Sequence, residues 1–273
     1  MSNFSVLLSV YHKEQPSYMR LSLDSIFNQT VKPTEVILVE DGPLTPELYN
    51  VIEEYSQKYK ELKVIKLAKN GGLGNALNEG LKHCSYELVA RMDTDDVCKP
   101  HRFERQLQLF SEHPEIDVCS SWIDEFVDDT NNVVSLRKLP ECNGDIVRYA
   151  KSRCPVNHPA VMYRRSKVME VGGYQGFPED SYLWVKLMLN GAVFYNIQES
   201  LIYFRTSNDV YKRRGGWKYA KDDIRAQWNF YRMGFLTFFD LVKNVLIRGT
   251  VRLMPNGLRV WIYNTFLRSN RKP

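Results

Sequence analysis

Long uncharged apolar runs, paired cysteines and internal repeats are missing from this 273-residue sequence. No uncharged apolar stretch reaches the about 18 residues that suit a membrane-spanning helix. The five cysteines are an odd number without C-x-x-C spacing, which argues against a zinc ribbon and favours a reducing compartment. The first residues lack the basic and apolar regions of a signal peptide. We therefore expect one large folded domain, with or without an appendage.

Three carboxylates follow a short apolar run in the segment LVARMDTDD, at residues 88–96. The run predicts a buried parallel strand that ends at Asp93, Asp95 and Asp96. Ligands bind beyond the carboxyl ends of strands in open α/β sheets, and Mg²⁺ or Mn²⁺ prefers oxygen ligands. The alternative is an acidic turn that caps the next helix, because Asp is a good N-cap and Pro100 suits a first turn. This stretch alone does not decide between a metal site and a turn.

Apolar, β-rich segments alternate with amphipathic helical segments along most of the chain. Strands are predicted at residues 4–10, 36–39, 64–67, 88–92, 118–126, 133–136, 192–197 and 201–204. Helices are predicted at residues 17–28, 46–59, 73–83, 102–112, 145–151, 166–171 and 182–190. The alternation in the first half predicts a parallel sheet covered on both faces, with its strand ends on one edge. Asp41, Asn70 and Asp93 are then expected to line one crevice.

The basic charge of the chain lies in its last quarter. Residues 211–273 contain 14 Lys/Arg and 3 Asp/Glu, a net charge of +11, whereas the remainder is acidic by 6 charges. The apolar pattern of residues 235–253 predicts an amphipathic helix. The apolar side of this helix is formed by Phe235, Phe238, Phe239, Val242, Val245 and Leu246. Such a helix is typical of peripheral binding to an anionic membrane surface. Packing on the rest of the chain or on a second subunit, as a homodimer, is the alternative; nucleic acid is not expected.

The order of these features resembles the family 2 inverting glycosyltransferases with the GT-A fold. The resemblance covers residues 4 to about 205, through VLLSVYHKEQPSYMRLSLDSIFNQT, EVILVEDG, NGGLGNALNEGL, RMDTDDVCKPHRFERQ, NHPAVMYRRSKVMEVGGY and PEDSYLWVKLMLNGA. It implies an α/β fold with a mostly parallel central sheet. The implied catalytic domain is 1–208, divided into a nucleotide-binding half, 1–97, and an acceptor half, 98–208. Residues 209–273 form the basic helical extension.

Among family members, the chain looks most like enzymes of bacterial O-antigen and exopolysaccharide assembly, including amylovoran-type galactosyltransferases. The resemblance implies transfer of galactose or glucose from UDP-Gal or UDP-Glc, with Mn²⁺ or Mg²⁺. The implied acceptor is a GlcNAc or GalNAc linked through diphosphate to undecaprenol. The implied location is the cytoplasm, peripheral on the inner face of the bacterial cell membrane.

The resemblance also implies roles for individual residues. Asp93 and Asp95 form the Asp-x-Asp metal motif, with Asp95 as the direct ligand. Asp180 is the implied general base, and Glu179 is its neighbour on the acceptor side. His158 and Trp184 are the other implied acceptor-binding residues. The implied donor-binding residues are Ser9, Val10, Tyr11, Glu14, Asp41, Asn70, Gly72, Arg91, Asp93 and Thr94.

One position departs from the family pattern, because Ser207 stands where many relatives have a metal-binding His. Two rival functions would also suit an α/β sheet with acids at its edge. A sugar-1-phosphate nucleotidyltransferase would need a Gly-rich basic signature after the first strand, where Tyr11 to Glu14 stand instead. A non-catalytic membrane adaptor of the same fold would be expected to lose Asp95 or Asp180, and both are present.

Overall fold

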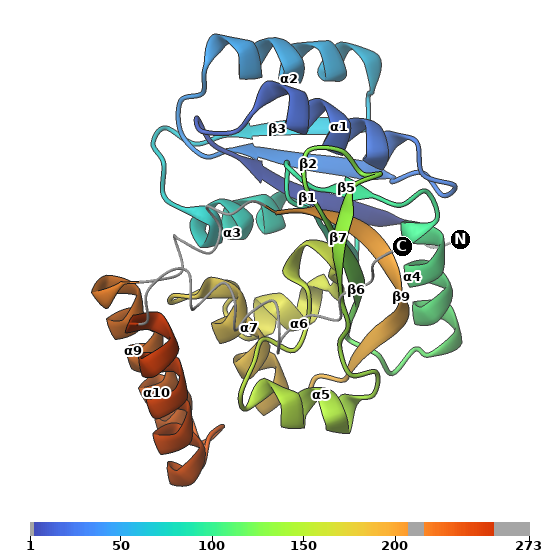
Figure 1. The fold of residues 1–273 in the computed structure, drawn as a ribbon. Coiled ribbons are helices and arrows are strands. Elements are labelled where there is room, and N and C mark those ends of the chain that lie inside the picture. Colours follow the sequence, from blue (N-terminus) through green and yellow to red (C-terminus); the bar gives the residue numbers. More distant parts are fainter. Residues whose placement is uncertain (1–2, 207–215, 254–273) are drawn as a thin grey trace.

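A single nine-stranded sheet organises the chain in a computed structural model that describes residues 3–206 and 216–253 (Figure 1). The first half contains β1 (Phe4–Val10), α1 (Pro16–Phe27), β2 (Glu35–Glu40), α2 (Pro46–Lys58), β3 (Leu62–Lys66), α3 (Leu73–His83) and β4 (Leu88–Arg91). The second half contains β5 (Val97–Cys98), α4 (Arg102–Glu112), β6 (Val118–Phe126), β7 (Val133–Arg137), α5 (Asn143–Ala150), η1 (His158–Ala160), β8 (Met162–Arg164), α6 (Arg165–Glu170), α7 (Glu179–Leu189) and β9 (Phe194–Arg205). Two further helices follow, α9 (Trp217–Arg232) and α10 (Phe238–Leu253).

The predicted parallel arrangement is confirmed for the first four strands. The sheet order is β3-β2-β1-β4-β8-β6-β9-β5, and β7 pairs with β6 outside this path. Strands β1 to β4 run parallel to one another, whereas β8 enters antiparallel between β4 and β6. The carboxyl ends of β1, β2 and β4 therefore meet at one edge, and this edge carries the candidate site.

Helices cover both faces of the sheet, as the apolar pattern predicts. Along β1, Val6 and Leu8 face one hydrophobic core while Leu7 faces the other. Helices α1 and α2 lie over one face in Figure 1, and α3 lies over the opposite face. Helix α2 begins where its sequence favours a start, since the Thr45 side chain accepts a hydrogen bond from Leu48 N and Pro46 occupies the first turn.

Three local predictions differ from the structure. The two strands expected at 192–197 and 201–204 form the single strand β9. Bulges beside Trp122 of β6 keep β9 paired with β6 through the polar residues 198–200, which lie between the two expected strands. Helix α7 begins at Glu179, three residues before the predicted start at 182, so the Glu-Asp pair lies in its first turn. The short strand β5 was not predicted, and it pairs with β9. The expected boundary between the halves 1–97 and 98–208 therefore falls inside β5.

The extension forms a helical hairpin that packs on the second half of the catalytic domain (Figure 1). Ala226, Phe230, Phe235 and Leu236 share a hydrophobic cluster with Val185 of α7. No helix in the ranges 3–206 and 216–253 is both long and apolar enough to cross a membrane. Ser207 lies outside the described residues.

Candidate active site

The aspartates that follow β4 converge as a group that can hold a metal ion. One carboxylate oxygen from each of Asp93, Asp95 and Asp96 lies within 4.8 Å of the others. Burial, followed by the charges of Asp93 and Glu14, raises the pKa of Asp95 to about 7. Burial and the charges of the other two aspartates also raise the pKa of Asp96. These shifts record the cost of gathering carboxylates away from water, and a divalent cation would relieve that cost.

Neighbouring residues hold this group in place. Arg91 is fully buried and binds both carboxylate oxygens of Asp93, with Nη1 donating to Oδ2 at 2.6 Å. The Ser22 hydroxyl donates to the backbone carbonyl of Asp93 at 2.9 Å. Arg91, which the resemblance places among the donor-binding residues, thus pairs with one of the clustered acids.

The donor set of this group fits a hard divalent ion. Every candidate ligand atom is a carboxylate oxygen, and Asp96 Oδ2 is buried without a hydrogen-bond partner among the residues described. Asp93 and Asp95 can therefore bind Mg²⁺ or Mn²⁺, while Asp96 supports them from the buried side. The alternative of a helix-capping turn is not what the structure shows, because α4 begins at Arg102 without a side-chain cap.

The loop after β2 is built around the buried carboxylate of Asp41. Its Oδ1 accepts a hydrogen bond from Gly71 N at 2.7 Å, and its Oδ2 accepts one from Gly72 N at 3.1 Å. Asn70 donates from its side chain to the Asp41 carbonyl at 3.2 Å. Gly42 is required here, because a Cβ on it would lie 2.4 Å from Asn70 N. The predicted meeting of the loops at Asp41 and Asn70 is thus confirmed, and each Asp41 oxygen keeps a lone pair for a ligand.

The loop after β1 approaches the aspartates through Glu14. Thr94 donates from Oγ1 to Glu14 Oε2 at 2.6 Å, and burial raises the pKa of Glu14. Ser9 is half-buried at the end of β1, Val10 is buried, and Tyr11 is exposed with its ring against His12. The side chains predicted to surround a uridine therefore lie at the same sheet edge as the acid group, although the nucleotide contacts themselves remain predictions.

The first turn of α7 brings two more carboxylates to this edge. A Cβ on Gly74 of α3 would lie 3.3 Å from Glu179 Cβ, so the two helix starts nearly touch. Burial, followed by the charge of Asp180, raises the pKa of Glu179, which also feels the charges of Arg91 and Asp93. Asp180 lies on the other side, where the Cys154 thiol approaches its Oδ2 at 3.6 Å. Glu179 therefore lies on the side of α7 that faces the aspartates at 93–96, and Asp180 lies on the side of the loop that contains Cys154.

The two other residues predicted to bind the acceptor have different surroundings. His158 Nε2 lies 3.1 Å from the Tyr174 hydroxyl, and burial together with the Arg91 charge lowers the pKa of His158 well below its ordinary value. The imidazole is therefore neutral near pH 7. Trp184 is 0% exposed and packs against His158 and Phe194. The indole lies beneath α7 and also lines the cleft described next, with its Nε1 lacking a hydrogen-bond partner among the described residues. Contact between Trp184 and an acceptor stays a prediction.

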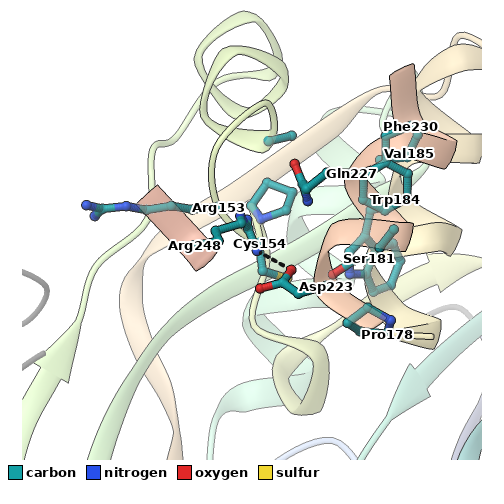
Figure 2. A pocket seen from close by; sticks show the side chains of 13 residues that line it. Arg153, Cys154, Pro178, Ser181, Trp184, Val185, Asp223, Gln227, Phe230 and Arg248 are labelled. Carbon is teal, nitrogen blue, oxygen red and sulfur yellow. Dashed lines mark hydrogen bonds and ion pairs between the residues drawn. The ribbon is translucent and has the colours of Figure 1, made fainter. Parts of the chain in front are cut away.

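A narrow cleft opens beside Asp180, between α7 and the helical hairpin. It is lined by Cys154, Pro178 and Ser181, and on the hairpin side by Asp223, Gln227 and Arg248 (Figure 2). Figure 2 shows Arg248 paired with Asp223, at 2.8 Å. The extension thus contributes a wall next to the candidate base.

Sequence analysis missed one residue of the site, Arg205 at the end of β9. Its backbone N–H donates to Asp96 Oδ1 at 2.8 Å, and its Nε donates to the Asp95 carbonyl at 2.9 Å. The only signal in the sequence was its place two residues before Ser207, in the segment compared with the metal-binding His of relatives.

The GT-A sheet, the glycine loop on Asp41 and the Asp-x-Asp group define a sugar-nucleotide-dependent glycosyltransferase. A sequence model of glycosyl transferase family 2 matches residues 5–172, and the chain belongs to this family. Family membership decides against the nucleotidyltransferase, whereas the argument against a non-catalytic adaptor of the same fold is the presence of Asp95 and Asp180.

Named relatives match over nearly their whole length. The chain is 40% identical to an Escherichia coli UDP-Gal:alpha-D-GlcNAc-diphosphoundecaprenol beta-1,3-galactosyltransferase, covering 97% of this chain and 96% of the relative. It is 37% identical to the amylovoran biosynthesis glycosyltransferase AmsE of Erwinia amylovora, covering 95% and 97%.

Solved structures support the fold. The S. aureus TarS 1-349 complex with UDP-GlcNAc has a TM-score of 0.60 at 21% identity, covering 85% of this chain and 72% of that one. The Pyrobaculum calidifontis mannosyltransferase PcManGT, in complex with GDP-Man and Mn²⁺, has a TM-score of 0.65 at 14% identity, covering 95% and 72%. At these identities the likeness concerns the fold alone.

Proposed function

We propose that this glycosyltransferase moves galactose from UDP-Gal to a hydroxyl of GlcNAc-diphospho-undecaprenol, with inversion to a β-linkage. The observation that carries the proposal is the 40% identity, over almost the whole of both chains, to an E. coli enzyme named for that reaction. The AmsE relative supports the same pathway class, O-antigen or exopolysaccharide assembly. UDP-Glc is the alternative donor, because glucose and galactose differ at one hydroxyl.

The donor end of the site suits a nucleoside diphosphate. Asp41 lies at the sheet edge with an acceptor lone pair free on each oxygen, and a carboxylate can accept the N3–H of uracil. Asp93 and Asp95 would hold Mn²⁺ or Mg²⁺ beside the diphosphate. When bound, that ion supplies positive charge to a UDP group that leaves as an anion.

The acceptor end needs one general base, because UDP leaves without protonation. Asp180 is the proposed base, which takes the proton of the acceptor hydroxyl as its oxygen attacks the anomeric carbon. Its position at the start of α7, beside the cleft and away from the paired Asp93, supports this role. Glu179, nearer the acid group, is proposed to bind hydroxyls of the sugars.

A lipid-linked acceptor also favours a place at a membrane surface. We propose that the protein is peripheral on the cytoplasmic face, where UDP-sugars and lipid-linked acceptors meet. The net charge of +11 over residues 211–273 supports this location.

The test is a transfer assay with purified full-length protein, Mn²⁺ and a synthetic GlcNAc-diphospho-lipid. UDP-Gal and UDP-Glc are compared, and the disaccharide linkage is determined by NMR. We expect a β-linked product from UDP-Gal, formed at least about tenfold faster than from UDP-Glc, a difference of about 1.4 kcal/mol in transition-state binding. Preference for UDP-Glc would correct the donor, and transfer from neither UDP-sugar would overturn the proposal.

A further inference from the structure

The helical hairpin presents an apolar surface that no described residue covers. On α10 the exposed side chains are Phe238, Phe239, Val242, Leu246 and Ile247. Phe239 is 84% exposed and Leu246 is 64% exposed. On α9, Trp228 is exposed and its ring contacts Tyr231, which in turn contacts Phe238. We name this continuous surface, formed by Trp228 and the five α10 residues, the hairpin face.

The hairpin face differs from the one that the sequence predicts. Phe235 was expected on it, but Phe235 is 7% exposed and packs in the cluster with Phe230 and Leu236. Ile247 belongs to the hairpin face instead, because polar side chains on the inner side of α10 attach this helix to the rest of the protein. Asn244 donates to the Lys151 carbonyl at 2.6 Å, and Arg248 donates to the Ser152 carbonyl at 2.7 Å.

These anchors fix the direction in which the hairpin face points. Asn244 also donates to Gln227 of α9 at 2.8 Å, and Asn229 donates to the Tyr182 hydroxyl of α7 at 2.6 Å. Partly buried hydrogen bonds tie both hairpin helices to the segment before Cys154 and to α7. The apolar surface is therefore a fixed part of the acceptor half of the molecule.

The charges around the hairpin face are complementary to an anionic surface. Asp223 is neutralised by Arg248, and Asp240 is occupied as a helix cap that accepts the Thr237 hydroxyl at 2.8 Å. Lys221, Arg225 and Arg232 are exposed on α9, and Lys243 is exposed on α10, where it pairs with Asp240 at 3.7 Å. The sequence beyond residue 253 adds four basic residues and no acidic one. Exposed Trp and Phe side chains flanked by cations are typical of helices that lie in a membrane interface.

We infer that the hairpin face is the surface through which this enzyme docks on an anionic lipid bilayer, with its acceptor half toward the lipid. This inference rests on the proposed function for its purpose, since docking would bring a lipid-linked sugar toward the cleft beside Asp180. Its physical basis is independent: burial of the exposed Phe and Leu side chains, together with attraction between Lys or Arg and acidic headgroups. A second copy of the chain on the same surface is the competing occupant.

The test is flotation of the full-length protein with vesicles of phosphatidylglycerol and phosphatidylcholine, or of phosphatidylcholine alone. The wild type should float with the anionic vesicles and be released by high salt. The double variant Phe239→Glu with Leu246→Glu should bind at least about tenfold more weakly, because it loses two buried apolar side chains and adds repulsion. The matched control is Leu21→Glu with Leu189→Glu, which changes the same charge at two exposed leucines elsewhere and should bind as the wild type does.

A second measurement separates this inference from the proposed function. The ratio of transfer rates on a vesicle-borne acceptor and on a water-soluble short-chain acceptor should fall in the Phe239/Leu246 variant and not in the control. Transfer by the wild type with no vesicle binding, or equal binding by wild type and variant, overturns the docking face alone. Vesicle binding without transfer to either acceptor overturns the proposed function alone. The wild type could also be a dimer in solution that becomes a monomer in the Phe239/Leu246 variant while vesicle binding does not change. That result would assign the hairpin face to a second copy and overturn docking on lipid.

Discussion

Arg205 clamps the aspartate loop to strand β9, with its backbone N–H on Asp96 Oδ1 at 2.8 Å. The guanidinium continues the contact by donating from Nε to the Asp95 carbonyl at 2.9 Å. The guanidinium carbon, Cζ, lies 3.8 Å from the centre of the Tyr18 ring and 4.5 Å from the centre of the Phe126 ring. A planar guanidinium held between rings is rigid, so the last strand of the catalytic domain positions the proposed metal ligands.

Arg205→Lys should weaken metal binding without abolishing the fold. A lysine keeps the charge but cannot combine ring stacking with the Nε hydrogen bond. Loss of such support for a metal site typically costs roughly 10–100-fold in metal affinity or activity. The Mn²⁺ concentration for half-maximal transfer should rise, and Mn²⁺ binding measured by calorimetry in the presence of UDP should weaken in parallel. Arg105→Lys, at an exposed ion pair with Glu199, is the control; an unchanged Mn²⁺ requirement for Arg205→Lys would show that Arg205 does not position the ligands.

Asp95→Asn should lower activity while leaving the metal-free protein as stable as before or more stable. Burial and the charges of Asp93 and Glu14 raise the pKa of Asp95 to about 7, so its ionised form is disfavoured in the folded state. Removing that charge relieves repulsion, and Tm measured at about pH 8 should not fall. Transfer should drop by roughly 10²-fold or more, because a charge that supports the leaving diphosphate is lost. Full activity of the variant in EDTA would exclude a metal role for Asp95, and Asp145→Asn, at an exposed pair with Arg148, controls for loss of a carboxylate.

The sequence predicts the first half of the fold well because local and global signals agree there. In β1, Phe4, Val6, Leu8 and Val10 belong to one core and Leu7 to the other, and the helices between strands have clear apolar faces. Asp41, Asn70 and the aspartates at 93–96 follow strand ends directly, so parallel strand direction is enough to bring them together.

The second half is less predictable because its pairing partners are distant in the chain. Strand β5 has two residues and forms only because Val97 and Cys98 pair with Tyr203 and Ile202. Trp184 illustrates the same limit: helical spacing places it near the Glu-Asp pair, but only tertiary packing decides that its ring points into the core. Arg205 acts through contacts with Tyr18 and Phe126, and neither contact has a local signature.

Part of the stability that the protein loses as pH falls into the acidic range should come from Glu35. This buried carboxylate accepts hydrogen bonds from Ser5 at 2.6 Å and Lys63 at 2.8 Å, and from Ser85. Burial alone would raise its pKa, but these hydrogen bonds outweigh burial and lower the pKa below the ordinary value of 4.5. A lowered pKa in the folded state means that Glu35 stabilises the fold above pH 4.5, and that this contribution is lost as pH falls through the folded-state pKa.

Glu35→Gln should therefore lower the free energy of unfolding by about 1–3 kcal/mol near pH 7. The difference from wild type should shrink as pH falls to about 4 and below. Urea unfolding followed by circular dichroism at several pH values measures both quantities. Glu54→Gln, which breaks an exposed ion pair with Arg20, should show little difference at any pH. If the difference in the free energy of unfolding between wild type and Glu35→Gln stayed constant with pH, this explanation would be wrong.

Asp180→Asn and Glu179→Gln should separate the two carboxylates of α7. If Asp180 is the general base, Asp180→Asn should lower kcat by about 10²–10⁴-fold, with little change in the KM for the UDP-sugar. Glu179 is nearer to Arg91 and Asp93, and its pKa is raised by burial and by Asp180. Glu179→Gln should instead raise the KM values for the sugars, with a smaller loss in kcat.

Asp180→Asn should still bind UDP with wild-type affinity in calorimetry, because Asp41 and the acid group after β4 are untouched. Asp145→Asn, at the exposed ion pair with Arg148, is the matched control, because it makes the same chemical change away from α7. Near wild-type kcat in Asp180→Asn, together with a large loss in Glu179→Gln, would exchange the two roles. That outcome would place the base on the side of α7 that faces the aspartates, and the acceptor would then approach between α3 and α7 instead of past Cys154.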